Sequence, residues 1–303
     1  SGPVAELTRV PFGPDRMRRI PLPLRIVALL LACVSLPLVA AEPARLSTAG
    51  PGVRVFTPPL RMPMSGFARR LRVYLPPGYA EGTRRYPVLY MFDGQNLFDD
   101  ATSYAGEWGV DEAMDRLARE DGLAVIVVGI DHGNALRIHE LIPYANPRFL
   151  PNGGAAFIDD VVHAIKPFVE ANYRTLPGPQ HTAVFGSSLG GLSADYAIHR
   201  YPRVFGMAGV FSPSYWVSGE AITVAARERL PAGSRVYLFI GGREGPDAVR
   251  QVEDMARVLG MHPGAAKVAL RVEPDAAHNE AAWREAFPRA VRWLFGHGDD
   301  PRD

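Results

Sequence analysis

A serine lies at the centre of a short glycine-rich segment that could act as a catalytic turn. Gly186-Ser187-Ser188-Leu189-Gly190-Gly191 has the pattern G-x-S-x-G, follows an apolar run typical of a strand, and precedes a helical pattern. In that context a sharp turn holds the central serine in a strained conformation that only small neighbours permit. We predict Ser188 as a nucleophile, with Ser187 at the variable position. A plain Gly/Ser turn is the alternative.

A serine hydroxyl is a weak nucleophile and needs a base, which an acid in turn orients. When a nucleophilic serine occupies a strand–turn–helix segment, the acid and then the histidine follow later in the chain. His278 follows the last predicted strand and precedes the C-terminal helical pattern, whereas the other histidines fall in helices, turns, the tail or a long loop. We therefore predict His278 as the base. A helix-capping or surface histidine is the alternative.

The acid should follow the strand predicted over 235–240. The sequence there is Gly241-Gly242-Arg243-Glu244-Gly245-Pro246-Asp247, so Glu244 and Asp247 both fit, while Asp254 lies deeper in the next helix. Asp247, directly after a proline, could instead serve in the first turn of a helix. We favour Glu244 and keep Asp247 as the alternative.

An oxyanion needs two backbone N–H donors. Leu189, directly after the nucleophile, should supply one. The other should come from the segment after the strand predicted over 86–92, where Gly94 would let the backbone approach the substrate and Gln95 would donate. A plain Asp-Gly turn is the alternative for this segment.

Apolar runs alternate with helical patterns from Gly52 onward. Near-continuous apolar runs are typical of strands buried on both faces of a parallel sheet. Their alternation with helices predicts a doubly wound, mostly parallel α/β fold with helices on both faces and ligands at the carboxyl ends of the strands. We predict strands over 53–56, 71–75, 86–92, 124–130, 182–185, 206–211, 235–240 and 267–272. We predict helices over 108–120, 155–172, 189–200, 218–229, 246–259 and 280–295, with Pro288 kinking or splitting the last.

The stretch from Ile130 to Asn152 is rich in Pro, Gly, Asn and Arg and lacks a clear period. A loop of that length in a compact domain is usually functional or poorly ordered. We expect it to form a wall of the active site, with His132 and His139 lining it.

Several motifs together resemble the "Putative esterase" family of α/β-hydrolases over most of residues 65–296. The family includes feruloyl and acetylxylan esterases, S-formylglutathione hydrolase, siderophore trilactone esterases and mycolyltransferases. The motifs are Tyr90 to Phe98, Glu107 to Asp111, Arg137 to Pro143, Gly186 to Gly191, Phe211 to Trp216, and His278 to Trp283. The resemblance implies an α/β-hydrolase fold, Ser188 and His278 in the roles above, and an acid near Glu244. It also implies that Tyr215 and Trp216 line an acyl pocket, with packing under the sheet as their alternative.

The N-terminal region has the layout of a secretory signal peptide. Met17-Arg18-Arg19 begins a basic segment, Ile26 to Leu36 is almost entirely apolar, and Val39-Ala40-Ala41 offers a cleavage site. The apolar run is too short and too interrupted by proline to span a bilayer comfortably. A lipoprotein signal with an acylated Cys33 is the alternative.

We therefore expect an upstream remnant over 1–16, a signal peptide over 17–41, and a single catalytic domain over 42–303 that is periplasmic or secreted.

Composition excludes several classes of function. The 303 residues include 33 basic and 32 acidic side chains and one cysteine. A net charge of +1, or −2 without residues 1–41, gives no basic field for nucleic acid. One cysteine forms no internal disulfide and no Cys-rich metal site, and no H-E-x-x-H pattern is present. We expect no cofactor and no metal.

These observations predict a serine carboxylesterase acting through an acyl-enzyme on a polysaccharide-linked ester, a siderophore lactone or a small ester. Acyl transfer to an alcohol other than water is one alternative. A binding protein on an inactive hydrolase scaffold is the other.

Overall fold

A computed structural model of the chain describes residues 45–261, 264 and 266–296. The predicted upstream remnant, the signal peptide and Cys33 lie outside these residues. Within the described part of the chain, no helix is both long enough and apolar enough to cross a membrane.

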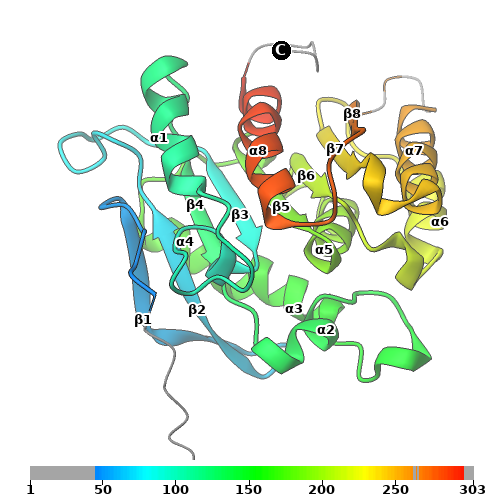
Figure 1. The fold of residues 1–303 in the computed structure, drawn as a ribbon. Coiled ribbons are helices and arrows are strands. Elements are labelled where there is room, and N and C mark those ends of the chain that lie inside the picture. Colours follow the sequence, from blue (N-terminus) through cyan, green and yellow to red (C-terminus); the bar gives the residue numbers. More distant parts are fainter. Residues whose placement is uncertain (1–44, 262–263, 265, 297–303) are drawn as a thin grey trace, which may run out of the picture. The chain divides into compact units, whose positions relative to one another are not determined.

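Eight strands form one sheet in the order β1-β2-β4-β3-β5-β6-β7-β8 (Figure 1). β2 is antiparallel to both β1 and β4, whereas every neighbouring pair from β4 to β8 is parallel. The bounds are Val53–Met62 (β1), Phe67–Tyr74 (β2), Val88–Phe92 (β3), Ile126–Ile130 (β4), Thr182–Ser187 (β5), Met207–Phe211 (β6), Arg235–Gly241 (β7) and Lys267–Glu273 (β8). Each strand overlaps a predicted one, and the predicted α/β-hydrolase fold is confirmed.

Helices cover both faces of the sheet, which explains why β3, β4, β5 and β6 are mostly apolar and are buried along their whole length (Figure 1). α1 (Val110–Glu120) and α8 (Glu280–Phe295) contribute to the apolar cluster on one face. The cluster on the other face includes residues of α3 (Gly154–Asp160), α4 (Lys166–Asn172), α5 (Leu189–Arg200), α6 (Glu220–Arg227) and α7 (Pro246–Gly260). The sheet is therefore the middle layer of three.

The segment predicted as a long loop contains short helical pieces. α2 (Arg137–Glu140) follows a 3-10 turn at Asn134–Leu136, and a second 3-10 turn spans Pro147–Phe149. One helical turn contains too few residues to show a hydrophobic period, so these pieces leave no signal in the sequence.

Two predicted helices differ in detail from the observed ones. The helix predicted over 155–172 consists of α3, a π-helical stretch at Val161–Ile165 and α4 in direct succession. α8 continues through Pro288 without a break, so the predicted split does not occur. A proline lacks one N–H donor, and the rest of this helix is held by its packing on the sheet.

Helix α5 contains a carboxylate without a hydrogen-bond partner. Asp195 is fully buried, and neither of its carboxylate oxygens accepts a hydrogen bond from the described residues. The nearest basic atom is Nδ1 of His199, 3.6 Å from Asp195 Oδ1. Burial raises the pKa of Asp195 from 3.8 to about 6, and the opposing effect of His199 is smaller.

This carboxylate makes the stability of the protein depend on pH. Between about pH 4 and pH 6 the folded state binds a proton at Asp195 that the unfolded state has released, so the free energy of unfolding falls as pH rises through this window. We expect Asp195→Asn to be more stable than the parent at pH 8, by on the order of 3 kcal/mol, with the difference vanishing below pH 4. Urea unfolding at both pH values measures it. Asp247→Asn, which alters a carboxylate that is 85% exposed, is the control and should show no such difference.

Candidate active site

Ser188 occupies a strained turn between β5 and α5. Its backbone has φ 58° and ψ −121°, a region that residues with a side chain rarely adopt. A Cβ added to Gly186 would lie 2.4 Å from the carbonyl oxygen of Gly190, and one added to Gly191 would lie 2.6 Å from that of Phe211. The turn therefore has no room for a side chain at Gly186 or at Gly191.

His278 and Glu244 form a direct pair. Nδ1 of His278 lies 2.6 Å from Oε2 of Glu244, whose side chain is 5% exposed. Asp247 instead faces solvent in the first turn of α7, paired with Arg250, and Asp254 is paired within the same helix. Of the predicted acids, the structure brings Glu244 to His278 and leaves the other two apart from it.

Three donors surround the Glu244 carboxylate. Besides the contact with His278, Oε1 accepts hydrogen bonds from Ser212 Oγ at 2.6 Å and from the N–H of Gly241 at 2.9 Å. Burial by itself raises the pKa of Glu244, but the hydrogen bonds from His278, Ser212 and Gly241 together outweigh it, and the pKa lies below its ordinary value. The buried side chain is therefore ionised at neutral pH.

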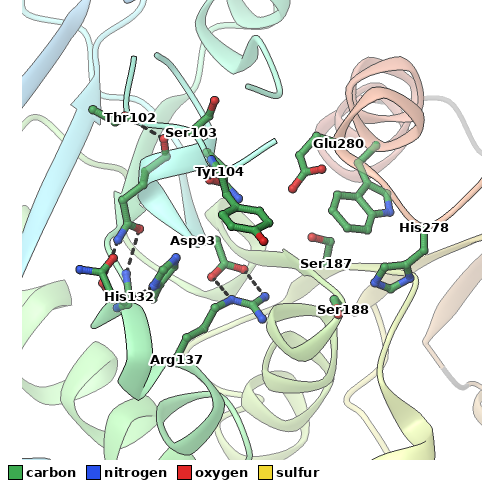
Figure 2. Close-up of a pocket in the computed structure, with 14 residues that line it drawn as sticks. Asp93, Thr102, Ser103, Tyr104, His132, Arg137, Ser187, Ser188, His278 and Glu280 are labelled. Carbon is green, nitrogen blue, oxygen red and sulfur yellow. Dashed lines mark hydrogen bonds and ion pairs between the residues drawn. The ribbon is translucent and has the colours of Figure 1, made fainter. Parts of the chain in front are cut away.

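The Ser188 hydroxyl lies beside the hydroxyl of another serine. Its Oγ is 3.3 Å from Oγ of Ser214, and among the described residues no hydrogen bond joins it to His278. Ser188 and His278 line the same cavity and lie on the same side of it (Figure 2). In enzymes without substrate such contacts are often long, and they shorten when substrate binds.

The cavity has a volume of about 570 Å³, within the range of small-molecule sites. Its walls come from the segments after β3, β4 and β5 and from the start of α8. The lining residues are Asp93, Gln95, Asn96, Thr102, Ser103, Tyr104, His132, Asn134, Arg137, Ser187, Ser188, His278, Glu280 and Trp283.

The two predicted oxyanion donors lie at the turns that face this cavity. Leu189 is the first residue of α5, and N–H groups in the first turn of a helix have no acceptor within it. Gln95 belongs to the 3-10 turn after β3, and its side-chain amide bonds both the carbonyl oxygen (2.8 Å) and the N–H (3.0 Å) of His132. These contacts hold the backbone of Gln95 in place.

Gly94 has a different role from the predicted one. A Cβ at this position would lie 2.6 Å from Oδ1 of Asp131 and 2.9 Å from its backbone nitrogen. The glycine thus lets the turn after β3 approach the end of β4, and Gly94 is not among the residues that line the cavity.

A charged pair in the cavity wall was not predicted. Nε and Nη2 of Arg137 donate to the two carboxylate oxygens of Asp93 at 2.7 and 2.8 Å (Figure 2). Burial by itself lowers the pKa of Arg137, but Asp93 and, to a smaller degree, Glu280 raise it above its ordinary value. Both partners belong to motifs noted in the sequence, yet 44 residues separate them and no spacing rule joins them.

Tyr215 and Trp216, which were expected to line an acyl pocket, lie outside the cavity. Tyr215 is 7% exposed, and Trp216 is 62% exposed and packs edge-on against Phe149. Neither lines the cavity, and neither does His139, whereas His132 does. The exposed aromatic side chain of the cavity is Tyr104, which no motif had indicated.

Comparison with known proteins identifies the family of this chain. The model of the family described as "Putative esterase" matches residues 65–294. The uncharacterized protein YbbA of Bacillus subtilis is 28% identical over 243 residues, which cover 75% of this chain and 93% of that protein. The iron(III) salmochelin esterase of Escherichia coli is 26% identical over 255 residues, 77% of this chain and 56% of that protein.

A solved structure shares the fold. The enterobactin esterase from Shigella flexneri, determined in the presence of 2,3-dihydroxy-N-benzoyl-glycine, superimposes with a TM-score of 0.66 at 20% identity, covering 82% of this chain and 61% of that one. The chain therefore belongs to the "Putative esterase" family and is an ester hydrolase of the α/β-hydrolase fold.

Proposed function

We propose that the protein is a serine carboxylesterase with Ser188 as nucleophile, His278 as base and Glu244 as the acid that orients the base. The observation that carries this proposal is the 2.6 Å contact between Glu244 and Nδ1 of His278 beside the cavity that Ser188 lines. With Nδ1 engaged by the carboxylate, Nε2 is the ring nitrogen left to accept a proton.

The reaction then follows from these positions. Ser188 Oγ attacks the ester carbonyl carbon while its proton passes to Nε2 of His278, and the N–H groups of Leu189 and Gln95 hold the oxyanion. The tetrahedral intermediate collapses, the C–O bond to the alcohol breaks, and His278 returns the proton to the leaving oxygen. Water repeats the sequence on the acyl-enzyme and releases the carboxylic acid.

The substrate that the cavity fits best is an ester of an aromatic acid. Tyr104 is 87% exposed, and its ring projects into the cavity that contains Ser188 (Figure 2). Its backbone N–H is held by Oδ1 of Asn96 at 3.0 Å, so the ring is presented on an anchored segment. An unpartnered aromatic face can stack on a planar acyl group. The compound in the enterobactin esterase structure also carries a planar dihydroxybenzoyl group, joined there to glycine through an amide nitrogen.

We also propose that residues 42–303 act as one exported catalytic domain, freed from a signal peptide over 17–41. The motifs of the N-terminal region and the family match over 65–294 support these limits. N-terminal sequencing of the protein secreted by an expressing cell should begin at Glu42.

Removing the nucleophile tests the mechanism. If the triad acts as a unit, Ser188→Ala should lower kcat for p-nitrophenyl acetate by a factor on the order of 10⁶. Full retention of hydrolysis would contradict the mechanism. Complete inactivity of the folded parent enzyme toward esters would instead favour a binding protein.

Neutralising each candidate acid separates Glu244 from Asp247. Glu244→Gln should lower kcat by a factor of about 10³ to 10⁴, because the imidazolium that forms in the reaction loses its anionic partner. Asp247→Asn is the matched control and should retain parental kcat, since its carboxylate faces solvent. The reverse pattern would identify Asp247 as the acid.

Truncating Tyr104 tests the acyl specificity. Tyr104→Ala should lower kcat/KM for feruloyl and dihydroxybenzoyl esters by about tenfold, the energy of one aromatic contact, and leave acetyl esters of the same alcohol nearly unchanged. Tyr104→Phe retains the ring and should resemble the parent. Equal losses on both kinds of ester would argue against an aromatic acyl site.

Assays with added acceptor alcohols show whether the acyl group passes to an alcohol or to water.

A further inference from the structure

We propose that Ser212 and Trp283 are positioning residues that hold the Glu244 carboxylate in place toward His278 and so extend the catalytic triad by two members. This inference rests on the proposed function. The two residues come from different parts of the fold, the end of β6 and the first turn of α8, and they meet at the Ser212 hydroxyl, which in turn bonds Glu244.

The hydrogen bonds run in a fixed direction from Trp283 to Glu244. Nε1–H of Trp283 donates to Ser212 Oγ at 2.9 Å, and Ser212 Oγ lies 2.6 Å from Oε1 of Glu244. An indole N–H is a donor only, so Ser212 Oγ must accept from it. The single hydroxyl hydrogen of Ser212 is thereby left to donate to Glu244.

Both groups that hydrogen-bond to Oε1 of Glu244 are consequently donors. They are the Ser212 hydroxyl and the N–H of Gly241, 2.9 Å away, while His278 is the partner of Oε2 among the described residues. A proton on Oε1 would face one of these two donors. The arrangement therefore selects the carboxylate, which agrees with the lowered pKa of Glu244.

Ser212 is held in an unusual backbone conformation at this point. It has φ 43° and is 2% exposed, and its N–H donates to the carbonyl oxygen of Phe239 at 2.7 Å. Non-glycine residues with positive φ are uncommon and occur preferentially at functional sites. The residue with this strained backbone is therefore the one whose hydroxyl donates to Glu244.

Trp283 begins the chain of hydrogen bonds and also packs against His278 at its other end. Besides its bond to Ser212, its ring lies edge-to-face with the His278 ring, 5.0 Å between centroids at 83°. The ring also packs on that of Trp108, with 5.6 Å between centroids. One rigid side chain thus fixes the hydroxyl that bonds the acid and limits the tilt of the base.

Three variants test whether Trp283 acts through Ser212. Ser212→Ala should lower kcat about tenfold, the effect of losing one hydrogen bond to a charged group. Trp283→Phe keeps an aromatic ring but removes the five-membered ring of the indole with its N–H, so the hydroxyl can rotate away, and kcat should fall about threefold. The double variant should be no slower than Ser212→Ala, because the indole has lost the group through which it acts. KM should stay within about twofold throughout.

The pH profile of kcat/KM gives a readout that a merely structural role would not move. Without the hydrogen bond from Ser212, the carboxylate form of Glu244 is less stabilised. The acidic limb of the profile, which reports the Glu244–His278 pair, should therefore move to higher pH in Ser212→Ala.

The matched control is Trp293→Phe. Trp293 is also buried in α8, and its Nε1 has no hydrogen-bond partner among the described residues, so this variant should keep the parental kcat and pH profile.

The outcomes separate this inference from the proposed function. Parental kcat and pH profile in both Ser212→Ala and Trp283→Phe would overturn the inference while leaving the triad intact. Additive losses in the double variant would assign Trp283 to packing alone. Activity that survives Ser188→Ala would overturn the proposed function itself. If Ser212→Ala does not fold, Trp283→Phe alone tests the inference. A parental pH profile in Trp283→Phe, with a kcat equal to that of Trp293→Phe, would then contradict it.

Discussion

The backbone at Ser188 is the constraint on which the site depends, because a turn this tight must be held from several sides. The N–H of Ser188 donates to the carbonyl of Phe211 at 2.9 Å, and its own carbonyl accepts from the N–H of Ser214 at 3.0 Å. Such a conformation costs on the order of 1–3 kcal/mol, which the surrounding core must offset. Phe185 and Phe211, with ring centroids 4.7 Å apart, belong to that core. The bonds that impose the strain also join the ends of β5 and β6.

Parallel pairing then places the remaining groups beside the serine. The ends of β5 to β8 lie along one edge of the sheet, and each strand delivers its part there: Ser188 after β5, Ser212 after β6, Glu244 after β7 and His278 after β8. The other half of the cavity is built from the segments after β3 and β4, where Arg137 and Asp93 form their ion pair. Ser188, Glu244 and His278 therefore follow other strands than the Asp93–Arg137 pair.

Much of this arrangement could be predicted because its signals are local in the sequence. Apolar runs indicated the strands from β3 to β8, and the glycine-rich segment indicated the turn at Ser188. The order of elements alone could not separate Glu244 from Asp247, because both follow β7; a 3-10 turn at Gly242–Glu244 folds the glutamate back onto the N–H of Gly241. Tyr104 and the Arg137 pair depend on contacts between distant segments, which no period or motif spacing reveals.

The most direct measurement is the site of covalent labelling in the folded enzyme. A fluorophosphonate reacts with a serine hydroxyl that a neighbouring base activates. The account predicts one adduct per chain, located on Ser188 by peptide mass spectrometry, with esterase activity lost in proportion to labelling and no labelling after denaturation. An adduct on another residue, or full activity in protein that is completely labelled at Ser188, would contradict it.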